Sequence, residues 1–518
     1  SAYGSKYVEV QDGDYYLDLS NGKVTDESVA DNARDDAAAS LRKKAKADTD
    51  GRYLKEGSPW AADTTQAGWS QSTEIPGEKF GDVWYATKLA NKDAANGYAS
   101  QSAGSSSSTT LNVFTDANGN YIDADYSLGK IKVTTTGSAT KSVYVENTND
   151  TYDTADKTGA ISAYVRNSQV LTQDKDYIYR KVDVTVAVTT ASSAHISQIG
   201  GEDVKNGNAF ITTDAGKTVT FAAIQKIAKA QDSDTIGGAK YSKSVTTYVI
   251  SDDSAVLTTK AQDFAALPYY TVANGKLTGY SVDTANNTIT VQTATLKSNN
   301  GLYYTDLGDT SDADDIEASD ISSSATTKDI EDKASSVQAD ADGNLWRLND
   351  GYIYEWDNDS DWNKVYKVDG SMDKMSVYDK DNIVVWNQDD EVYSVLGGKG
   401  TTKTTDDGTT TGTTTTTAAA GWVKAADGTW AYNKADGTKA TGWLQDGATW
   451  YYLNTNGVMQ TGWVSVSGTW YYLNASGAMQ TGWINDGGTW YYCNASGAML
   501  ANTVVDGYVL GSTGAWVK

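Results

Sequence analysis

The side chains that most often carry out hydrolysis are nearly absent from this chain, which has one histidine and one cysteine. Zinc hydrolases bring two or three imidazoles into one site, so His195 alone cannot build such a centre. Cys493 stands where two sequence repeats carry Leu453 and Leu473, and we expect it to pack rather than react. A Ser-His-Asp hydrolase would have to use His195, but no G-x-S-x-G motif accompanies it. We therefore predict no catalytic residue of these classes.

Carboxylates are abundant, and because two of them suffice for a glycosidase, that reaction stays open. Many Asp residues nevertheless stand in turn sequences such as Asp342-Gly343. Segments 116–120 and 357–363 place oxygen-bearing side chains at alternate positions, as calcium loops do, but neither has a glutamate at the twelfth position. Asp- and Asn-rich turns account for both segments. The sequence predicts no metal site, no cofactor and no enzyme.

The chain carries a large negative charge, with 67 acidic and 42 basic side chains and a formal charge of −25. Proteins that bind phosphate backbones need Lys and Arg to displace counterions, so nucleic acid is a poor partner. No stretch approaches the roughly 20 apolar residues that cross a bilayer, and we expect no membrane insertion. The sequence begins at Ser1 without an initiator Met, as a secreted protein does after signal cleavage. We expect an acidic extracellular protein.

Aromatic residues recur near the C-terminus with a period of 20 residues. The recurring positions are the Trp of a Gly-Trp pair, the Trp of a TWYY segment and a Met, namely Trp443, Trp463 and Trp483; Trp450, Trp470 and Trp490; and Met459, Met479 and Met499. A looser copy holds Trp422 and Trp430, and a degenerate last copy holds Tyr508. Such a period predicts a solenoid, whose terminal repeats differ because they cap the array.

Each repeat is predicted to be a β-hairpin. The segment 449–453, TWYYL, is rich in strand-forming aromatic residues, and Gly-containing turns flank it. Side chains alternate along a strand, so Trp450 and Tyr452 lie on one face and Tyr451 and Leu453 on the other. A lone hairpin would expose aromatic rings on both faces, and stacking of neighbouring hairpins covers them.

Composition divides the chain into three predicted parts. Residues 399–419 are predicted to be a linker, because twelve of the seventeen residues from 401 to 417 are Thr. Such a segment has too few large apolar side chains to offset the entropic cost of ordering its backbone. Residues 420–518 hold the repeats. Residues 1–398 form an acidic all-β domain, since short strand-like runs separated by Asp, Asn or Gly follow one another, most regularly between 343 and 396.

The overall fold class is all-β, and for residues 1–398 the strand spacing favours a β-propeller of seven or eight blades. Tandem β-sandwiches are the alternative. Two helical insertions are expected as well, at 26–46, where apolar residues share one stripe, and at 218–230, where the pattern is weaker.

The pattern of residues 441–499, with Gly-Trp, Trp-Tyr-Tyr, Gly and Met in register over three copies, resembles the choline-binding repeats, also known as cell wall binding repeats. The N-terminal part is similar to the extracellular regions of clostridial-type cell wall binding surface proteins. The first resemblance implies that two Trp of one repeat and a Tyr of the next hold a quaternary ammonium group, with the repeat Met lining the contact. Carried onto this sequence, the ligand-binding residues form four cages, which are Trp422, Trp430 and Tyr451; Trp443, Trp450 and Tyr471; Trp463, Trp470 and Tyr491; and Trp483, Trp490 and Tyr508; with Met479 and Met499 beside them.

Aromatic rings suit this ligand because a trimethylammonium group donates no conventional hydrogen bond and is attracted by ring faces. The resemblance therefore favours a secreted, non-enzymatic protein of the cell surface, bound to choline-bearing teichoic acid through several weak cages acting together. Residues 1–398 would face outward as an interaction surface. Another cell wall polymer stays open as the ligand. The alternative functions are a self-assembling surface layer or filament, with the chain as a homo-oligomer, and a cell wall glycan hydrolase.

Overall fold

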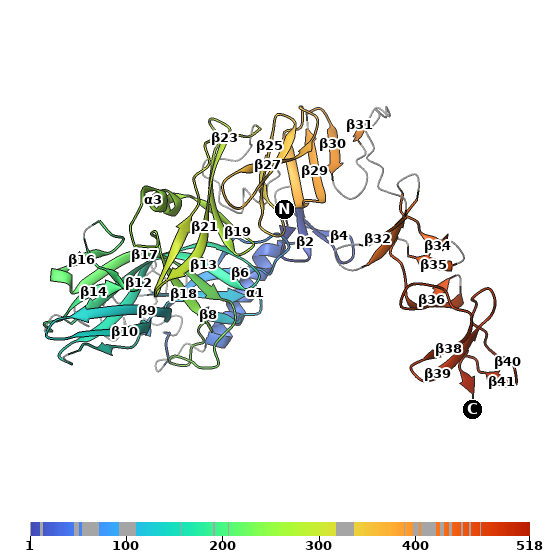
Figure 1. The fold of residues 1–518 in the computed structure, drawn as a ribbon, viewed down its shortest axis with the longest axis horizontal. Coiled ribbons are helices and arrows are strands. Elements are labelled where there is room, and N and C mark those ends of the chain that lie inside the picture. The colour runs from blue at the N-terminus through green and yellow to red at the C-terminus, as the bar shows by residue number, and fades with distance from the viewer. Residues whose placement is uncertain are drawn as a thin grey trace. The chain divides into compact units, whose positions relative to one another are not determined.

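The structure is a computed structural model that divides the chain into two compact units (Figure 1). The first unit comprises Ser1–Leu396 with Lys403–Thr410, and the second comprises Gly397–Thr402 with Thr411–Lys518. The described residues are 2–10, 14–45, 51–53, 72–92, 110–155, 157–189, 192–205, 207–317, 336–387, 389–396, 403–405, 421–424, 429–434, 438–446, 449–454, 457–466 and 468–517. Of the predicted linker at 399–419, only 403–405 falls within them.

An eleven-stranded sheet is the largest element of the first unit. Its strands run in the order β11-β12-β13-β17-β18-β22-β21-β20-β19, with β16 beside β17 and β23 beside β21. Only β18 and β22 pair in parallel, through Val249 and Tyr304, which joins two antiparallel halves. The strands are β11 (Tyr152–Asp153), β12 (Ala160–Gln173), β13 (Tyr177–Val188), β16 (Ile211–Thr213), β17 (Thr218–Ala228), β18 (Val245–Val249), β19 (Tyr269–Ala273), β20 (Lys276–Asp283), β21 (Thr288–Asn299), β22 (Leu302–Leu307) and β23 (Asp314–Asp315).

A four-stranded sheet packs against one end of the large sheet. It consists of β10 (Thr140–Asn147), β9 (Ser127–Thr136), β14 (His195–Ile199) and β15 (Glu202–Asp203) in that order. The core between the two sheets joins Leu128, Val133 and Val145 of the smaller sheet to Val184 and Phe221 of the larger one, and all five are at most 1% exposed. The period of two along β13 and β17 thus buries one row of apolar side chains between two layers.

Four further four-stranded sheets complete the first unit, each built from consecutive strands. Two of them come from the N-terminal part, with strands β1 (Ala2–Tyr3), β2 (Tyr7–Val10), β3 (Tyr15–Asp18) and β4 (Lys23–Thr25), and β5 (Thr73–Glu74), β6 (Trp84–Ala90), β7 (Thr110–Asp116) and β8 (Tyr121–Asp123). The other two follow the large sheet, with strands β24 (Val337–Ala339), β25 (Leu345–Asn349), β26 (Tyr352–Trp356) and β27 (Trp362–Lys367), and β28 (Lys374–Asp379), β29 (Asn382–Asn387), β30 (Val392–Leu396) and β31 (Lys403–Thr405).

The all-β class is confirmed, but the sheet topology does not support the predicted β-propeller. A propeller repeats small four-stranded blades around an axis, whereas β12 and β13 are 14 and 12 residues long and belong to an eleven-stranded sheet. The meanders β24–β27 and β28–β31 resemble blades, and their regular spacing suggested the propeller. Two sheets packed face to face agree better with the sandwich alternative.

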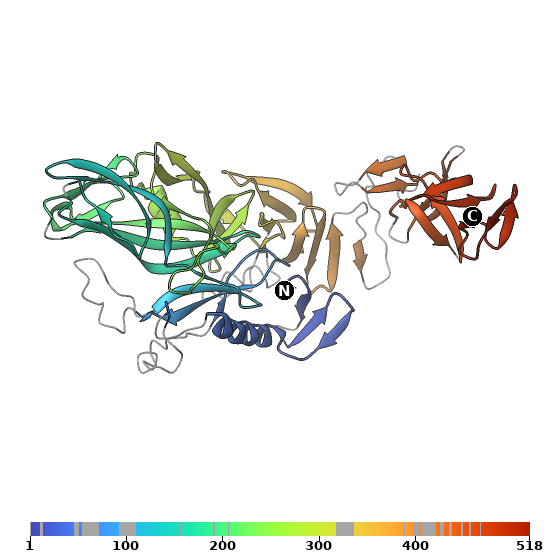
Figure 2. The ribbon, with the colours of Figure 1, turned by 90° about the horizontal axis from the view of Figure 1, so that it is seen from below.

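One of the two predicted helices is present. Helix α1 (Val29–Ala45) packs Leu41 and Ala45 against Leu89 and Val113 of β6 and β7, and Figure 2 shows it in dark blue beside light blue strands. The prediction at 218–230 is wrong, because this segment is β17, which pairs with β13 along its whole length. Tertiary pairing there overrides the local pattern. Two described helical elements were not predicted, η2 (Asp214–Gly216) and α3 (Thr259–Ala266), the latter capped by the Thr258 hydroxyl.

The second unit consists of hairpins, as the repeats predicted. Their strands are β32 (Gly421–Lys424) and β33 (Trp430–Asn433), β34 (Gly442–Asp446) and β35 (Thr449–Leu453), β36 (Gly462–Val466) and β37 (Thr469–Leu473), and β38 (Gly482–Asp486) and β39 (Thr489–Cys493). The last sheet has three strands, β40 (Thr503–Val505), β41 (Tyr508–Leu510) and β42 (Trp516–Val517). We number these the first to fifth hairpins.

Backbone hydrogen bonds tie the second, third and fourth hairpins each to the preceding one. The amide of Met479, which follows the third hairpin, donates to the Trp450 carbonyl of the second at 2.8 Å, and Met499 donates to Trp470 in the same way at 2.8 Å. The Met side chain packs against the next repeat, where a Cβ on Gly497 would lie 2.4 Å from the Met479 sulfur. Gly497 also has a positive φ of 81°, so glycine is required there on two grounds.

Candidate ligand-binding site

The two faces of a hairpin carry different residues, and the second hairpin illustrates the arrangement. Across its strands Trp443 pairs with Tyr452, and Gln445 pairs with Trp450. Because side chains alternate, Trp443, Trp450 and Tyr452 share one face, which we call the tryptophan face. The ring centroids of Trp443 and Tyr452 are 5.2 Å apart, and those of Trp443 and Trp450 are 6.4 Å apart.

The opposite face, which we call the tyrosine face, carries Leu444, Asp446, Tyr451 and Leu453. Leu453 is fully buried, and Tyr451 contacts Trp422 of the first hairpin with a centroid distance of 4.6 Å. The boundary between two hairpins is therefore formed by the tryptophan face of one and the tyrosine face of the next.

All four predicted inter-hairpin pairs of Trp and Tyr are in edge contact, with centroid distances of 4.6 Å for Trp422 and Tyr451, 4.7 Å for Trp443 and Tyr471, 4.9 Å for Trp463 and Tyr491, and 5.3 Å for Trp483 and Tyr508. The second Trp of each predicted cage lies at the rim. Trp430, Trp450, Trp470 and Trp490 are 39 to 46% exposed, which is unusual for such large apolar side chains. Met479 and Met499 lie beside this rim through their backbone bonds to Trp450 and Trp470.

Sequence reasoning missed one aromatic residue in each of the first four hairpins. These tyrosines lie across the strand pair from the Gly-Trp tryptophan at centroid distances of 5.0 to 5.3 Å, and they are Tyr432, Tyr452, Tyr472 and Tyr492. The hairpin register identifies them, because a residue opposite a Trp on the same face must contact it.

Two carboxylates bordering the cages were missed as well. The indole Nε1 of Trp422 donates to Asp446 Oδ2 at 2.9 Å, and that of Trp463 donates to Asp486 Oδ2 at 3.1 Å. Both Asp side chains are exposed and occupy the last position of a first strand. The third hairpin has Val466 in that place. The first and third cages thus have a carboxylate at the rim, and the second cage has a valine.

A carboxylate on the indole N–H affects what the cage attracts. The negative charge polarises the indole through a charge-assisted hydrogen bond, which makes the ring face more attractive to a cation. It also adds direct Coulomb attraction at the mouth of the cage. A positively charged group would consequently be favoured over a neutral one at the first and third of these predicted cages.

The residues considered for catalysis do not form a site. His195 is exposed at the start of β14, and Cys493 is fully buried opposite Gly482, in the packing position that the repeats predicted. Burial raises the pKa of the Cys493 thiol to about 11, so the thiol stays protonated at neutral pH.

The two segments considered for calcium use their carboxylates within their own turns. Asp116 Oδ1 accepts the backbone N–H groups of Asn118 and Asn120, each at 2.8 Å, and Asp357 Oδ1 accepts three N–H groups in the same manner. Within the ranges that the structure describes, no three His, Cys, Asp or Glu side chains are grouped to hold a metal. Neither described helix has the length and apolar character to cross a membrane.

Two sequence profiles match the hairpins. The profile of the choline-binding repeat matches residues 460–503, and that of a cell wall binding repeat matches residues 441–459. No curated protein matches the chain.

Several solved structures are similar to parts of the chain. The choline binding domain of Spr1274 from Streptococcus pneumoniae is 50% identical over 15% of this chain and 96% of its own, with a TM-score of 0.15. CbpJ from the same organism is 29% identical over 35% of this chain and 61% of its own, with a TM-score of 0.16. The cell wall endolysin of phage Cp-1, in complex with choline, is 30% identical over 21% of this chain and 30% of its own, with a TM-score of 0.15. Scores this low do not establish a shared overall fold.

Proposed function

We infer, from the membership of residues 441–503 in the choline-binding repeat family, that the second unit binds choline groups of a cell wall polymer such as teichoic acid. The binding residues would be the four aromatic cages between hairpins. The tyrosines that lie opposite the Gly-Trp tryptophans would complete each cage.

Within this proposal, the observation that favours choline over a neutral ligand is the pair of exposed carboxylates on the indoles of Trp422 and Trp463. A neutral sugar gains little from a negative charge beside an aromatic ring, whereas a quaternary ammonium group gains from both the ring and the charge. The half-exposed tryptophans at the rim supply the apolar surface that the methyl groups would cover. These features favour choline over a neutral wall glycan as the ligand of the hairpins.

Several cages in one array would bind the same polymer at the same time. Cation–π contacts contribute roughly 0.5 to 2 kcal/mol each, so a single cage binds weakly. Cages linked by a short and regular repeat convert successive contacts into intramolecular steps, which raises overall avidity without any new contact. Retention on a decorated polymer would therefore greatly exceed the affinity for free choline.

We assign the chain a non-enzymatic role at the cell surface, with the first unit as an interaction surface. Support comes from the exposed His195, the buried and protonated Cys493, and the carboxylates engaged in their own turns. A loss of turbidity when the full chain is mixed with purified walls would contradict this role and restore the glycan hydrolase.

The test is retention of the full chain on choline-bearing cell walls and elution by free choline. Trp463→Ala removes the ring at the centre of the third cage and should weaken retention severalfold, since one cation–π contact is lost. Trp463→Phe, which keeps a ring face, is the matched control and should retain more. The unfolding transition of the first unit should be the same in both variants.

Two results would contradict the proposal in different ways. Unchanged retention of Trp463→Ala would show that this cage does not hold the ligand. Elution by a neutral wall sugar but not by choline would assign the hairpins to another wall polymer.

A further inference from the structure

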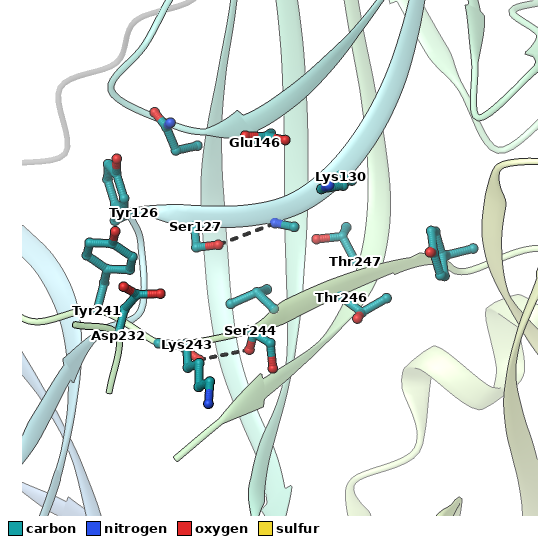
Figure 3. Close-up of a pocket in the computed structure, with 15 residues that line it drawn as sticks. Tyr126, Ser127, Lys130, Glu146, Asp232, Tyr241, Lys243, Ser244, Thr246 and Thr247 are labelled. Carbon is teal, nitrogen blue, oxygen red and sulfur yellow. Dashed lines mark hydrogen bonds between the residues drawn. The ribbon is translucent and has the colours of Figure 1, made fainter. Parts of the chain in front are cut away.

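The first unit contains an open hollow of about 430 Å³ that no assigned function uses (Figure 3). Strands β9 and β10 form one side of it, and residues 241–247, which lead into β18, form the other. Its volume lies within the range of roughly 300 to 1,000 Å³ that small-molecule sites occupy.

The floor of the hollow is fixed by buried groups. Gly129 has a φ of 77°, and a Cβ there would lie 2.4 Å from the carbonyl oxygen of Val245, so only glycine lets β9 pass this close. The buried hydroxyls of Ser242 and Thr247 donate to the carbonyls of Ala228 and Leu128, each at 2.8 Å. A floor held in this way needs little rearrangement to receive a ligand.

Two tyrosines close one end of the hollow. The rings of Tyr126 and Tyr241 are 4.5 Å apart between centroids, come from different segments and lie together in Figure 3. Both side chains are partly exposed, and neither hydroxyl forms a hydrogen bond within the described part of the chain. Burial raises the pKa of both phenols, so they stay neutral at physiological pH. A third tyrosine, Tyr303, also lines the hollow and is 37% exposed.

The charges around the hollow cancel. Lys130 and Lys243 oppose Glu146 and Asp232, so the lining carries no net formal charge in a chain of −25. Lys130, Lys243 and Glu146 are exposed at the rim, and Ser244, also exposed, lies beside Lys243 on the β18 side of the hollow in Figure 3. Such a lining offers donors and acceptors of both kinds without selecting an anion or a cation.

We propose that this hollow binds a neutral oligosaccharide. A pyranose ring has an apolar C–H face that covers an aromatic ring, and its edge carries hydroxyls that exchange hydrogen bonds with polar side chains. Partly exposed tyrosines supply apolar surface together with a polar tip. The hydroxyls of Tyr126 and Tyr241, the exposed Ser244 and the charged side chains of the rim supply the hydrogen-bonding groups. The site lies in the first unit and is independent of the choline cages.

The experiment exposes the full chain to an array of neutral and acidic oligosaccharides in saturating choline, so that the cages are occupied. At least one neutral oligosaccharide should bind. Tyr241→Ala removes one of the two contacting rings and should weaken that binding about tenfold. Ser244→Arg should also weaken it, because the longer side chain fills the hollow from an exposed position where it disturbs no packing.

Val24→Ser, at an exposed position of β4 outside both the hollow and the cages, is the control and should bind the same oligosaccharide as the unaltered chain. The unfolding transition of the first unit is compared in every variant, and Ser244→Arg keeps the test valid if Tyr241→Ala loosens the fold. Binding of no neutral oligosaccharide, binding of acidic ones alone, or full binding by a folded Ser244→Arg would each overturn the proposal.

Discussion

Both units contain a tryptophan whose indole N–H donates to an aspartate, and the surroundings of the two bonds differ. In the first unit, Trp346 Nε1 donates to Asp340 Oδ2 at 2.9 Å, with the residues 0 and 2% exposed. In the second unit, Trp463 and Asp486 make the same bond at 3.1 Å, but the aspartate is exposed. The buried bond satisfies polar groups that water cannot reach. In the exposed bond, water can replace the aspartate as the partner of the indole N–H, so the bond adds little to stability. Its effect is instead on the binding of a ligand to the indole ring.

Replacing each aspartate by alanine should separate these two roles most clearly. Asp340→Ala leaves the Trp346 N–H and the turn amides of Asp342 and Asn344 without their acceptor, and should destabilise the first unit by about 3 kcal/mol. Asp486→Ala should leave the unfolding transition of either unit nearly unchanged. Urea unfolding of the full chain followed by near-ultraviolet circular dichroism measures both. Equal destabilisation by the two variants would remove the distinction.

Substitution of the carboxylates in the second unit should instead change the affinity of the cages for choline. Asp486→Asn should lower the choline affinity of the third cage about threefold, and Val466→Asp should raise that of the second cage by a similar factor, because exposed charges contribute modestly. The indole N–H resonances of Trp443 and Trp463 report the two cages separately during a choline titration.

The control for these variants is 3,3-dimethylbutan-1-ol, a neutral carbon analogue of choline. Its affinity should not change, and added salt should reduce the difference for choline. If both ligands lose affinity equally in Asp486→Asn, the carboxylate positions the indole and does not select a cation.

The smallest expected effect concerns pH. Burial raises the pKa of the Asp340 carboxyl above its usual 3.8, although hydrogen bonds from Trp346 and Asn344 oppose the shift. A raised folded-state pKa gives stability that is present below the unfolded pKa and is lost as the pH rises through the folded value. Asp340→Asn abolishes this titration. The unaltered chain loses this stability as the pH rises, and the variant does not. The unfolding free energy of Asp340→Asn minus that of the unaltered chain should therefore increase between pH 3.5 and pH 6. A difference that stays constant over this range would contradict the raised pKa of Asp340.

The contrast between the units also explains how much the sequence could predict. In the second unit each hairpin contacts mainly its neighbours, so a period of 20 residues implies the hairpins, the contact of Trp443 with Tyr471 and the burial of Cys493. The face of Tyr452 was predicted, but its contact with Trp443 and that of Asp446 with Trp422 were missed because both depend on the hairpin register. Both follow once the turn length is known.

In the first unit, strand existence was predictable and strand pairing was not. The large sheet depends on a parallel contact between Val249 and Tyr304, which no local pattern encodes. The regular strands after residue 343 say nothing about the pairing of longer strands before it. At 218–230 the residues suited a helix, and pairing with β13 and β18 made the segment a strand. Long-range contacts thus decided what composition left open.

The packing of each Met sulfur against the glycine of the next repeat has a consequence for how the array can evolve. Because the contacts that join one hairpin to the next recur every 20 residues, duplication or deletion of one unit in the gene recreates the same junction on either side. The number of repeats can therefore change in a single recombination event without a new interface having to arise. Substitution at one position, the last of each first strand, can then distinguish the copies, as Asp446, Val466 and Asp486 do here.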